Sequence, residues 1–151
     1  EFCRGSIVAD YVRFKVLTGL RKDDILKIHR SQLKDDGIHI TVGKTGRRIV
    51  IRWSPALREV VSDLQHGSMF LFSTKHGRPY TYSGFNAMWQ RKMRAAKQSG
   101  VLEERFKDSD LRAFVADAVG LDHAKELLAH ASSATTERHY RRKPRSVDPG
   151  A

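Results

Sequence analysis

The sequence predicts an α+β fold that is mostly helical and carries one small antiparallel sheet. Apolar residues recur at helical spacing over most of the chain, whereas strand-like alternation flanks a single turn near residue 45. The 151 residues and the 40% hydrophobic content suffice for a domain with its own core. We therefore expect one domain over 1–151, with a loose tail at 144–151.

Two helices are predicted at the start of the chain. Residues 6–18 carry apolar side chains at three- and four-residue spacing, and Gly19 is a suitable residue to end that helix. Asp23 and Asp24 place carboxylates at the positive end of a second, short helix that is expected to run to about His29.

A β-hairpin is predicted at about 37–52. Apolar and polar residues alternate over 37–42, residues 43–46 have the composition of a turn, and 47–52 form the returning strand. The turn contains Lys44, and Arg47 and Arg48 follow it directly. The tip of the hairpin is therefore expected to be basic.

The rest of the chain is predicted to be largely helical. Ser54 has the character of an N-cap, and Pro55 suits the first helical position after it. Residues 69–72 are a short apolar segment whose type the pattern does not decide. Further helices are expected at 82–99, 110–120, 123–130 and 133–140. Tyr11, Tyr80 and Tyr82 lack a dense cluster of basic residues around them and are interpreted as packing residues.

The charge of the chain favours a polyanionic partner. Lys and Arg number 28 against 17 Asp and Glu, which gives a net charge of +11 distributed over both halves of the sequence. A domain this basic is typical of DNA or RNA binding, although solvated surface lysines would give the same count. With the single cysteine Cys3 there is no disulfide framework and no cysteine-based metal site, and no apolar run could span a membrane.

One tyrosine near the end of the chain lies in a dense cluster of positive charge. Tyr140 follows Arg138 and His139 and precedes Arg141 and Arg142. A phenol with its ordinary pKa of about 10 is a poor nucleophile at neutral pH, but nearby cations favour the phenolate. The same cations attract a phosphate. The segment therefore suggests a tyrosine that attacks a nucleic-acid backbone.

Five short motifs occur in a characteristic order: TGLRKDD at 18–24, GKT at 43–45, DLR at 110–112, LLAH at 127–130 and TTERHY at 135–140. Each motif alone is weak, but the ordered set resembles the catalytic domain of the tyrosine recombinases, the phage-integrase family, over about residues 7–145. The resemblance implies a tyrosine-recombinase-like fold. It also implies metal-independent DNA breakage and rejoining without a cofactor.

The resemblance assigns two arginines to the phosphate. Arg21 and Arg112 would hold the non-bridging oxygens, where a planar guanidinium can donate to two oxygens at once. Asp24 would orient Arg21 from behind. The other interpretations are an ion pair of Arg21 with Asp24 on the helix surface and a solvated Arg112.

The remaining catalytic roles follow from the same resemblance. Lys44 would give a proton to the leaving 5′-oxygen, or only touch a phosphate as Arg47 and Arg48 are expected to do. His130 would hydrogen-bond the scissile phosphate, or only cap a helix. Tyr140 would attack and form a 3′-phosphotyrosine, or close the last helix as a core aromatic. Arg138, Arg141 and Arg142 are expected to contact DNA.

Ser109 departs from the family pattern, which has His or Lys at this position. Serine is not a general base near neutral pH, so we expect it to hydrogen-bond the phosphate in a slow enzyme. Two other interpretations remain, namely that Asp108 or another group substitutes for the missing residue or that the domain no longer catalyses the reaction.

The resemblance also predicts the partners. We expect double-stranded DNA as the substrate, other recombinase protomers in a tetrameric synapse, and no small molecule or membrane. The family's N-terminal core-binding domain is expected to be absent, and a cytoplasmic, DNA-associated location in a bacterium is expected. The alternative functions are a DNA-binding module without chemistry and a topoisomerase-like enzyme that nicks and closes DNA.

Overall fold

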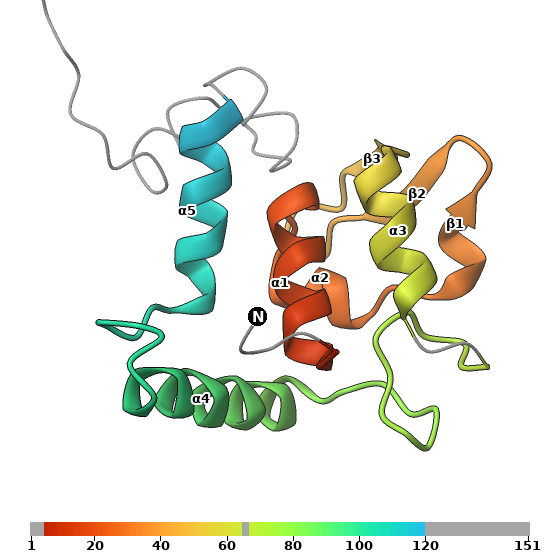
Figure 1. The fold of residues 1–151 in the computed structure, drawn as a ribbon. Coiled ribbons are helices and arrows are strands. Elements are labelled where there is room, and N and C mark those ends of the chain that lie inside the picture. Colours follow the sequence, from red (N-terminus) through yellow and green to blue (C-terminus); the bar gives the residue numbers. More distant parts are fainter. Residues whose placement is uncertain (1–4, 65–66, 120–151) are drawn as a thin grey trace, which may run out of the picture.

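In the computed structural model, residues 5–64 and 67–119 are described, and their elements are five helices, a short 3₁₀ turn and a small sheet (Figure 1). The bounds in chain order are α1 (Ile7–Thr18), α2 (Lys22–Leu26), η1 (Arg30–Gln32), β1 (Leu33–Lys34), β2 (Gly37–Thr41), β3 (Arg48–Arg52), α3 (Pro55–Asp63), α4 (Tyr82–Gln98) and α5 (Asp108–Val119). The predicted α+β class is confirmed.

Helix α1 is the central element of the described part of the chain. It contacts α3, α4 and α5, and Figure 1 shows it between α5 on one side and α3 with the sheet on the other. Ser6 caps its N-terminus by accepting the backbone N–H of Ala9. Gly19 ends it with φ of 63°, a left-handed conformation that glycine adopts without the steric cost of a side chain.

The sheet has the order β1-β2-β3 and is antiparallel throughout. Ile38 lies opposite Ile51 and Ile40 opposite Ile49, so these side chains share one face. Gly37 is required because a Cβ there would approach the carbonyl oxygen of Ile51 to 2.3 Å. The hairpin was predicted, but β1 was not, since two residues are too few to produce a pattern.

Two predicted helices differ in their bounds. The second helix ends at Leu26, and His29 instead caps η1 by accepting the N–H of Ser31 through its side chain. Helix α5 begins at Asp108, two residues before the predicted start. The expected cap at Ser54 and the proline at the start of α3 are both present.

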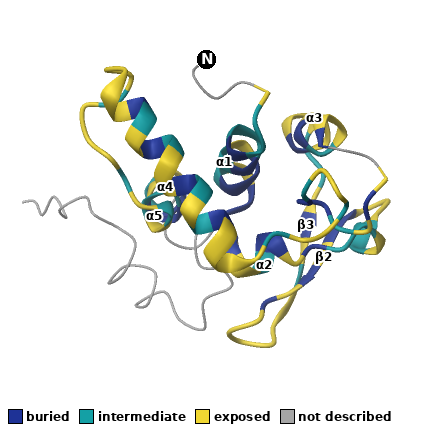
Figure 2. Cartoon of the chain, turned by 90° about the horizontal axis from the view of Figure 1, so that it is seen from below, coloured by how far each residue is buried: buried dark blue, intermediate teal, exposed yellow. Residues whose placement is uncertain are grey.

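The core is built around aromatic side chains that face α1. The ring of Tyr11 lies 4.5 Å from that of Phe85 and 6.2 Å from that of Trp89, and Phe14 lies 5.4 Å from Phe72. All five side chains are buried, and Figure 2 shows buried residues along α1 and on one side of α4. Burying a large apolar side chain contributes about 1.5–3 kcal/mol, so this cluster fixes the helices around α1.

The segment at 69–72 forms no regular element. Phe70 makes an isolated bridge to His29, while Leu71 and Phe72 are buried and Met69 is exposed. Tyr11 packs in the core as predicted, but the same prediction for Tyr82 is wrong, since Tyr82 is 55% exposed. The Nζ of Lys22 lies 4.1 Å from the centre of its ring, a cation–π contact that joins α2 to α4.

Candidate active site

The connection between α1 and α2 carries Arg21, the first predicted phosphate ligand. Arg21 precedes α2 at its N-cap position, and its side chain is half-buried. One terminal nitrogen, Nη1, is buried without a hydrogen-bond acceptor among the residues that the structure describes. A buried donor of this kind needs an acceptor, and a phosphate oxygen would serve.

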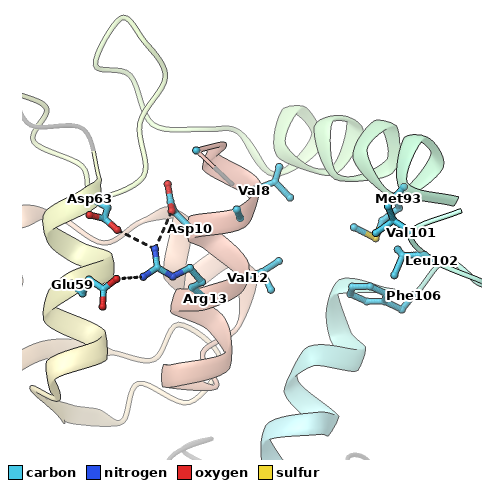
Figure 3. Close-up of a pocket in the computed structure, with 13 residues that line it drawn as sticks. Val8, Asp10, Val12, Arg13, Glu59, Asp63, Met93, Val101, Leu102 and Phe106 are labelled. Atoms are coloured by element: carbon cyan, nitrogen blue, oxygen red, sulfur yellow. Dashed lines mark hydrogen bonds and ion pairs between the residues drawn. The ribbon is translucent and has the colours of Figure 1, made fainter. Parts of the chain in front are cut away.

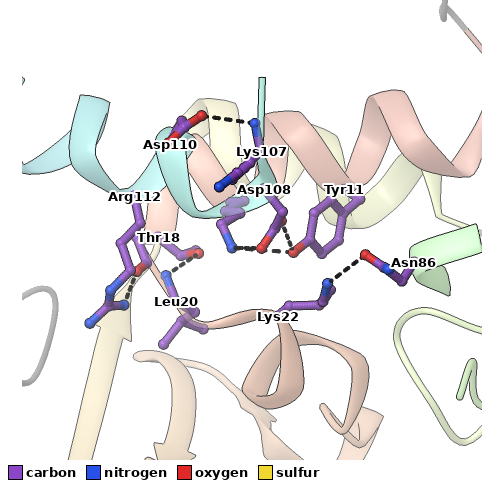
Figure 4. A network of polar contacts seen from close by, with 11 residues as sticks. Tyr11, Thr18, Leu20, Lys22, Asn86, Lys107, Asp108, Asp110 and Arg112 are labelled. Atoms are coloured by element: carbon purple, nitrogen blue, oxygen red, sulfur yellow. Dashed lines mark hydrogen bonds and ion pairs between the residues drawn. The ribbon is translucent and has the colours of Figure 1, made fainter. Parts of the chain in front are cut away.

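Arg112 reaches the same connection from α5. Its side chain is buried, and Nη1 donates a hydrogen bond to the carbonyl oxygen of Gly19 (Figure 4). Gly19 stands two residues before Arg21, and the two predicted arginines are 91 positions apart in the sequence. The alternative interpretation of a solvated Arg112 is therefore wrong, because the residue is 3% exposed.

Asp24 joins the hairpin to this region. Its Oδ1 accepts the backbone N–H of Gly43 at 2.9 Å, so α2 holds the first residue of the turn that carries Lys44. No ion pair between Asp24 and Arg21 occurs within the described part of the chain. The contact that Asp24 makes is thus with the turn, rather than with the arginine it was expected to orient.

Lys44 lies in an exposed turn at the end of the hairpin. Val42 accepts the N–H groups of Thr45 and Gly46, at 3.2 and 2.7 Å, and these two bonds close the turn. Lys44, Arg47 and Arg48 are all exposed, and Figure 2 shows the hairpin end as an exposed loop. The predicted basic tip is present, and its cations are accessible to a large partner.

Ser109 lies at the second residue of α5 and is exposed. Its neighbour Asp108 is already engaged, since its carboxylate accepts hydrogen bonds from Tyr11 at 2.6 Å and from Lys15 at 2.8 Å. These contacts count against the interpretation that Asp108 takes over the role of the missing basic residue.

The other predicted site residues lie outside the described residues. They are His130, Arg138, Tyr140, Arg141 and Arg142. The helices expected at 123–130 and 133–140 and the tail at 144–151 lie there too. Within the described ranges, no group of three or more His, Cys, Asp or Glu is placed to hold a metal ion, and no helix has the length and apolarity to cross a membrane.

A cavity of about 760 Å³ lies elsewhere on the described part (Figure 3). Apolar side chains including Val8, Met93 and Phe106 line it, and the ion pairs of Arg13 with Glu59 and Asp63 lie on its α3 side. None of the predicted site residues lines this cavity. We therefore place the candidate active site in the region where three segments contact one another, at 19–24, 43–48 and 108–112.

Sequence reasoning missed the buried polar contacts next to this site. Lys15 is buried on α1 and bonds Asp108, which lies 93 positions later in the sequence. The only local signal was that Tyr11 and Lys15 stand four residues apart and so share one face of a mostly apolar helix. Periodicity does not reveal a partner so distant in sequence.

Comparisons with known proteins identify the family and the fold. The family described as the phage integrase family matches residues 6–146. No curated protein matches the chain in sequence.

Solved structures with the same fold include two of lambda integrase. One, a dimer bound to a COC′ core site, is 21% identical over 96% of this chain and 56% of its own, with a TM-score of 0.74. The other, a tetramer bound to a Holliday junction, is 21% identical over 96% of this chain and 45% of its own, with a TM-score of 0.73. XerA recombinase is 16% identical over 95% of this chain and 55% of its own, with a TM-score of 0.74. The chain thus spans about half the length of these proteins.

Proposed function

The chain belongs to the phage integrase family, and on that premise we propose that it breaks and rejoins DNA strands through a covalent link to Tyr140. One observation carries the proposal furthest: Arg112 of α5 reaches the carbonyl of Gly19, two residues before Arg21. Two guanidinium groups from distant parts of the sequence thereby belong to one region. Fixed cationic donors of this kind stabilise the charge that develops on a phosphate under attack.

The proposed reaction uses the residues of this chain alone. The hydroxyl oxygen of Tyr140 attacks the scissile phosphorus and forms a new O–P bond, while the bond from phosphorus to the 5′-oxygen breaks. Lys44 gives its proton to that 5′-oxygen, and the phenol proton passes to solvent because Ser109 is not a base at neutral pH. The products are a 3′-phosphotyrosine and a free 5′-hydroxyl. Attack by that hydroxyl reverses the step and needs no ATP.

The other site residues would act on the phosphate itself. Arg21 and Arg112 would each donate to the non-bridging oxygens, and the buried Nη1 of Arg21 is a donor in need of such an acceptor. His130 and Ser109 would add neutral hydrogen bonds. Asp24 would act indirectly, since it holds the turn of Lys44 through Gly43.

We further propose double-stranded DNA as the substrate and other copies of the chain as partners in a tetrameric assembly. The net charge of +11 and the exposed cations of the hairpin support a DNA partner. The lambda integrase structures, a dimer on a core site and a tetramer on a Holliday junction, support the assembly by analogy of fold. Within this proposal, residues 1–151 form a single catalytic domain.

Ser109 favours a second candidate, a domain that binds DNA without cleaving it. A neutral, exposed serine replaces the basic residue that the family pattern places there. Because one acid–base contributor is worth about 10²–10⁴-fold in rate, we expect slow cleavage rather than none.

A trapping experiment separates the two candidates. The chain is incubated with a nicked duplex whose short 5′-hydroxyl fragment diffuses away after cleavage, and the products are run on a denaturing gel. We expect a protein–DNA band that is lost in Tyr140→Phe. If low salt and excess protein still give no band, while a shift assay shows binding, the binding-only function is correct.

A further inference from the structure

Lys15 is a buried ammonium group in the third turn of α1. The residue is 1% exposed, and Nζ donates to Asp108 Oδ2 at 2.8 Å and to the hydroxyl oxygen of Tyr11 at 3.3 Å. The Tyr11 hydroxyl in turn donates to Asp108 Oδ1 at 2.6 Å. The three polar groups form a closed network between α1 and the first residue of α5 (Figure 4).

Stability alone does not account for this network. Removing an ammonium and a carboxylate from water costs free energy that their attraction offsets only in part, and apolar replacements of both are often neutral or stabilising. A buried ion pair does, however, impose a direction and a distance, which apolar contacts do not. The network is therefore best explained by the geometry it imposes on α5.

Two side chains of α5 form hydrogen bonds to one turn of α1. Asp108 bonds Lys15, and Arg112, one turn further along α5, bonds the carbonyl of Gly19. Lys15 and Gly19 are themselves joined, because the Gly19 N–H donates to the Lys15 carbonyl at 2.7 Å. Two fixed points about 6 Å apart along a helix determine both its rotation and its axial position.

Ser109 and Arg112 are the residues whose placement depends on these two points. Ser109 follows Asp108 directly, and its side chain is exposed while that of Asp108 is half-buried against α1. Without the Asp108 contact, the first turn of α5 would lose its directional bonds to Lys15 and Tyr11, and the apolar contacts of the buried Ala113, Val115 and Ala116 are not directional.

We propose that the Lys15–Asp108 pair is a positioning device for the cleavage step. It sets the rotation of the first turn of α5, so that Ser109 and Arg112 face the phosphate held by Arg21. Lys15 and Tyr11 are buried and touch no DNA, so they act only through Asp108. The inference rests on the proposed function, because it names residues that position that same site.

Three variants of the full chain test it: Lys15→Met, Asp108→Asn, and the two together. Lys15→Met leaves a half-buried carboxylate without its cation, so we expect a lower Tm and slower cleavage. The double variant removes both charges while the Asn oxygen still accepts from Tyr11. We expect its Tm to return close to the wild-type value. Its single-turnover rate of covalent-complex formation should stay about 10–100-fold low, as a misplaced group predicts, with DNA affinity unchanged.

Arg13→Met is the matched control. Arg13 lies on the same helix, but its ion pairs reach Glu59 and Asp63 at the other side, toward α3. We expect the wild-type cleavage rate in this variant. A double variant that regains both Tm and cleavage rate would overturn the proposal, because the pair would then be purely structural.

Amide hydrogen exchange gives a readout that does not depend on catalysis. In the double variant, the amides of residues 109–113 should exchange faster than in the wild type, although the Tm values agree. Equal protection would also overturn the proposal. If the wild type forms no covalent complex, the proposed function fails, while this exchange measurement still decides whether the pair positions α5.

Discussion

Substitution of Asp24 tests whether its single hydrogen bond to Gly43 positions the turn that carries Lys44. Its carboxylate accepts the N–H of Gly43, next to Lys44. Asp24→Ala removes the acceptor, and a hydrogen bond worth about 1 kcal/mol predicts a rate of covalent-complex formation about fivefold to tenfold lower. Asp24→Asn keeps an acceptor oxygen and should retain most of the rate. Equal losses in both variants would mean that the negative charge acts on Arg21, as the sequence analysis expected.

Substitution of Ser109 tests whether this residue limits the rate of the proposed cleavage. Ser109→His restores a side chain that can exchange a proton near neutral pH, so we expect more covalent product in single-turnover assays. Ser109→Ala serves as the control and should lower the yield, because the hydroxyl is expected to bond the phosphate. A histidine variant no faster than the wild type would count against the role assigned to this position.

Several of the site residues were predictable one by one, and others were not. Arg21, Lys44 and Arg112 were predicted from short motifs, and the structure brings the segments that carry them together through Asp24 and Gly19. Lys15 was not predicted, since its burial depends on a carboxylate 93 positions away. The contact of Asp24 with Gly43 was not predicted either, because the two residues are 19 positions apart in the sequence.

At the scale of the element, the contact between α1 and α5 gives a pH dependence. Burial lowers the pKa of Lys15, while Asp108 raises it in part, and Arg112 on α5 and Lys22 on α2 lower it further. Burial and Asp108 raise the pKa of Tyr11, so its hydroxyl stays protonated. As pH rises, Lys15 in the folded state therefore loses its proton before Tyr11 does, and the ion pair with Asp108 is lost with that proton.

The sign of the effect differs between stability and cleavage. Between the lowered pKa of folded Lys15 and the unfolded value of 10.5, the unfolded chain binds more protons, so this group raises the free energy of unfolding as pH rises. The contribution of the ion pair to the cleavage rate should instead fall as pH rises. We expect the ratio of wild-type to Lys15→Met/Asp108→Asn cleavage rates to fall toward one as pH rises from neutral toward 10.5. A ratio that stays constant over this range would contradict a role for the ammonium.

The elements themselves were predictable where a local signal marked an end. Gly19 ends α1 as expected, and Ser54 with Pro55 starts α3. The strand β1 depends on pairing with β2, and two residues carry no periodicity of their own. The second helix was predicted too long because the capping interaction of His29 in η1 is not evident from residue type.

At the scale of the whole molecule, the basic hairpin should contribute to DNA affinity mainly through phosphates. Replacing both Arg47 and Arg48 with Gln should weaken binding to all duplexes alike and reduce the slope of log K against log salt by about two. Arg13→Gln is the control, since its ion pairs with Glu59 and Asp63 already compensate its charge. An unchanged slope in the hairpin variant would place the hairpin away from the DNA.

The proposed site consists of three described segments and a tyrosine further along the chain. Arg112 and Asp24 tie the segments at 19–24, 43–48 and 108–112 into one region, and family membership covers residues 6–146. We propose that a phosphate bound there becomes linked to Tyr140.

Peptide mapping of the trapped adduct by mass spectrometry tests that claim most directly. After digestion of protein and DNA, we expect a nucleotide phosphate on the peptide that contains Tyr140, and no such adduct in Tyr140→Phe. An adduct on Tyr11, Tyr80 or Tyr82, or one that persists in Tyr140→Phe, would contradict the account.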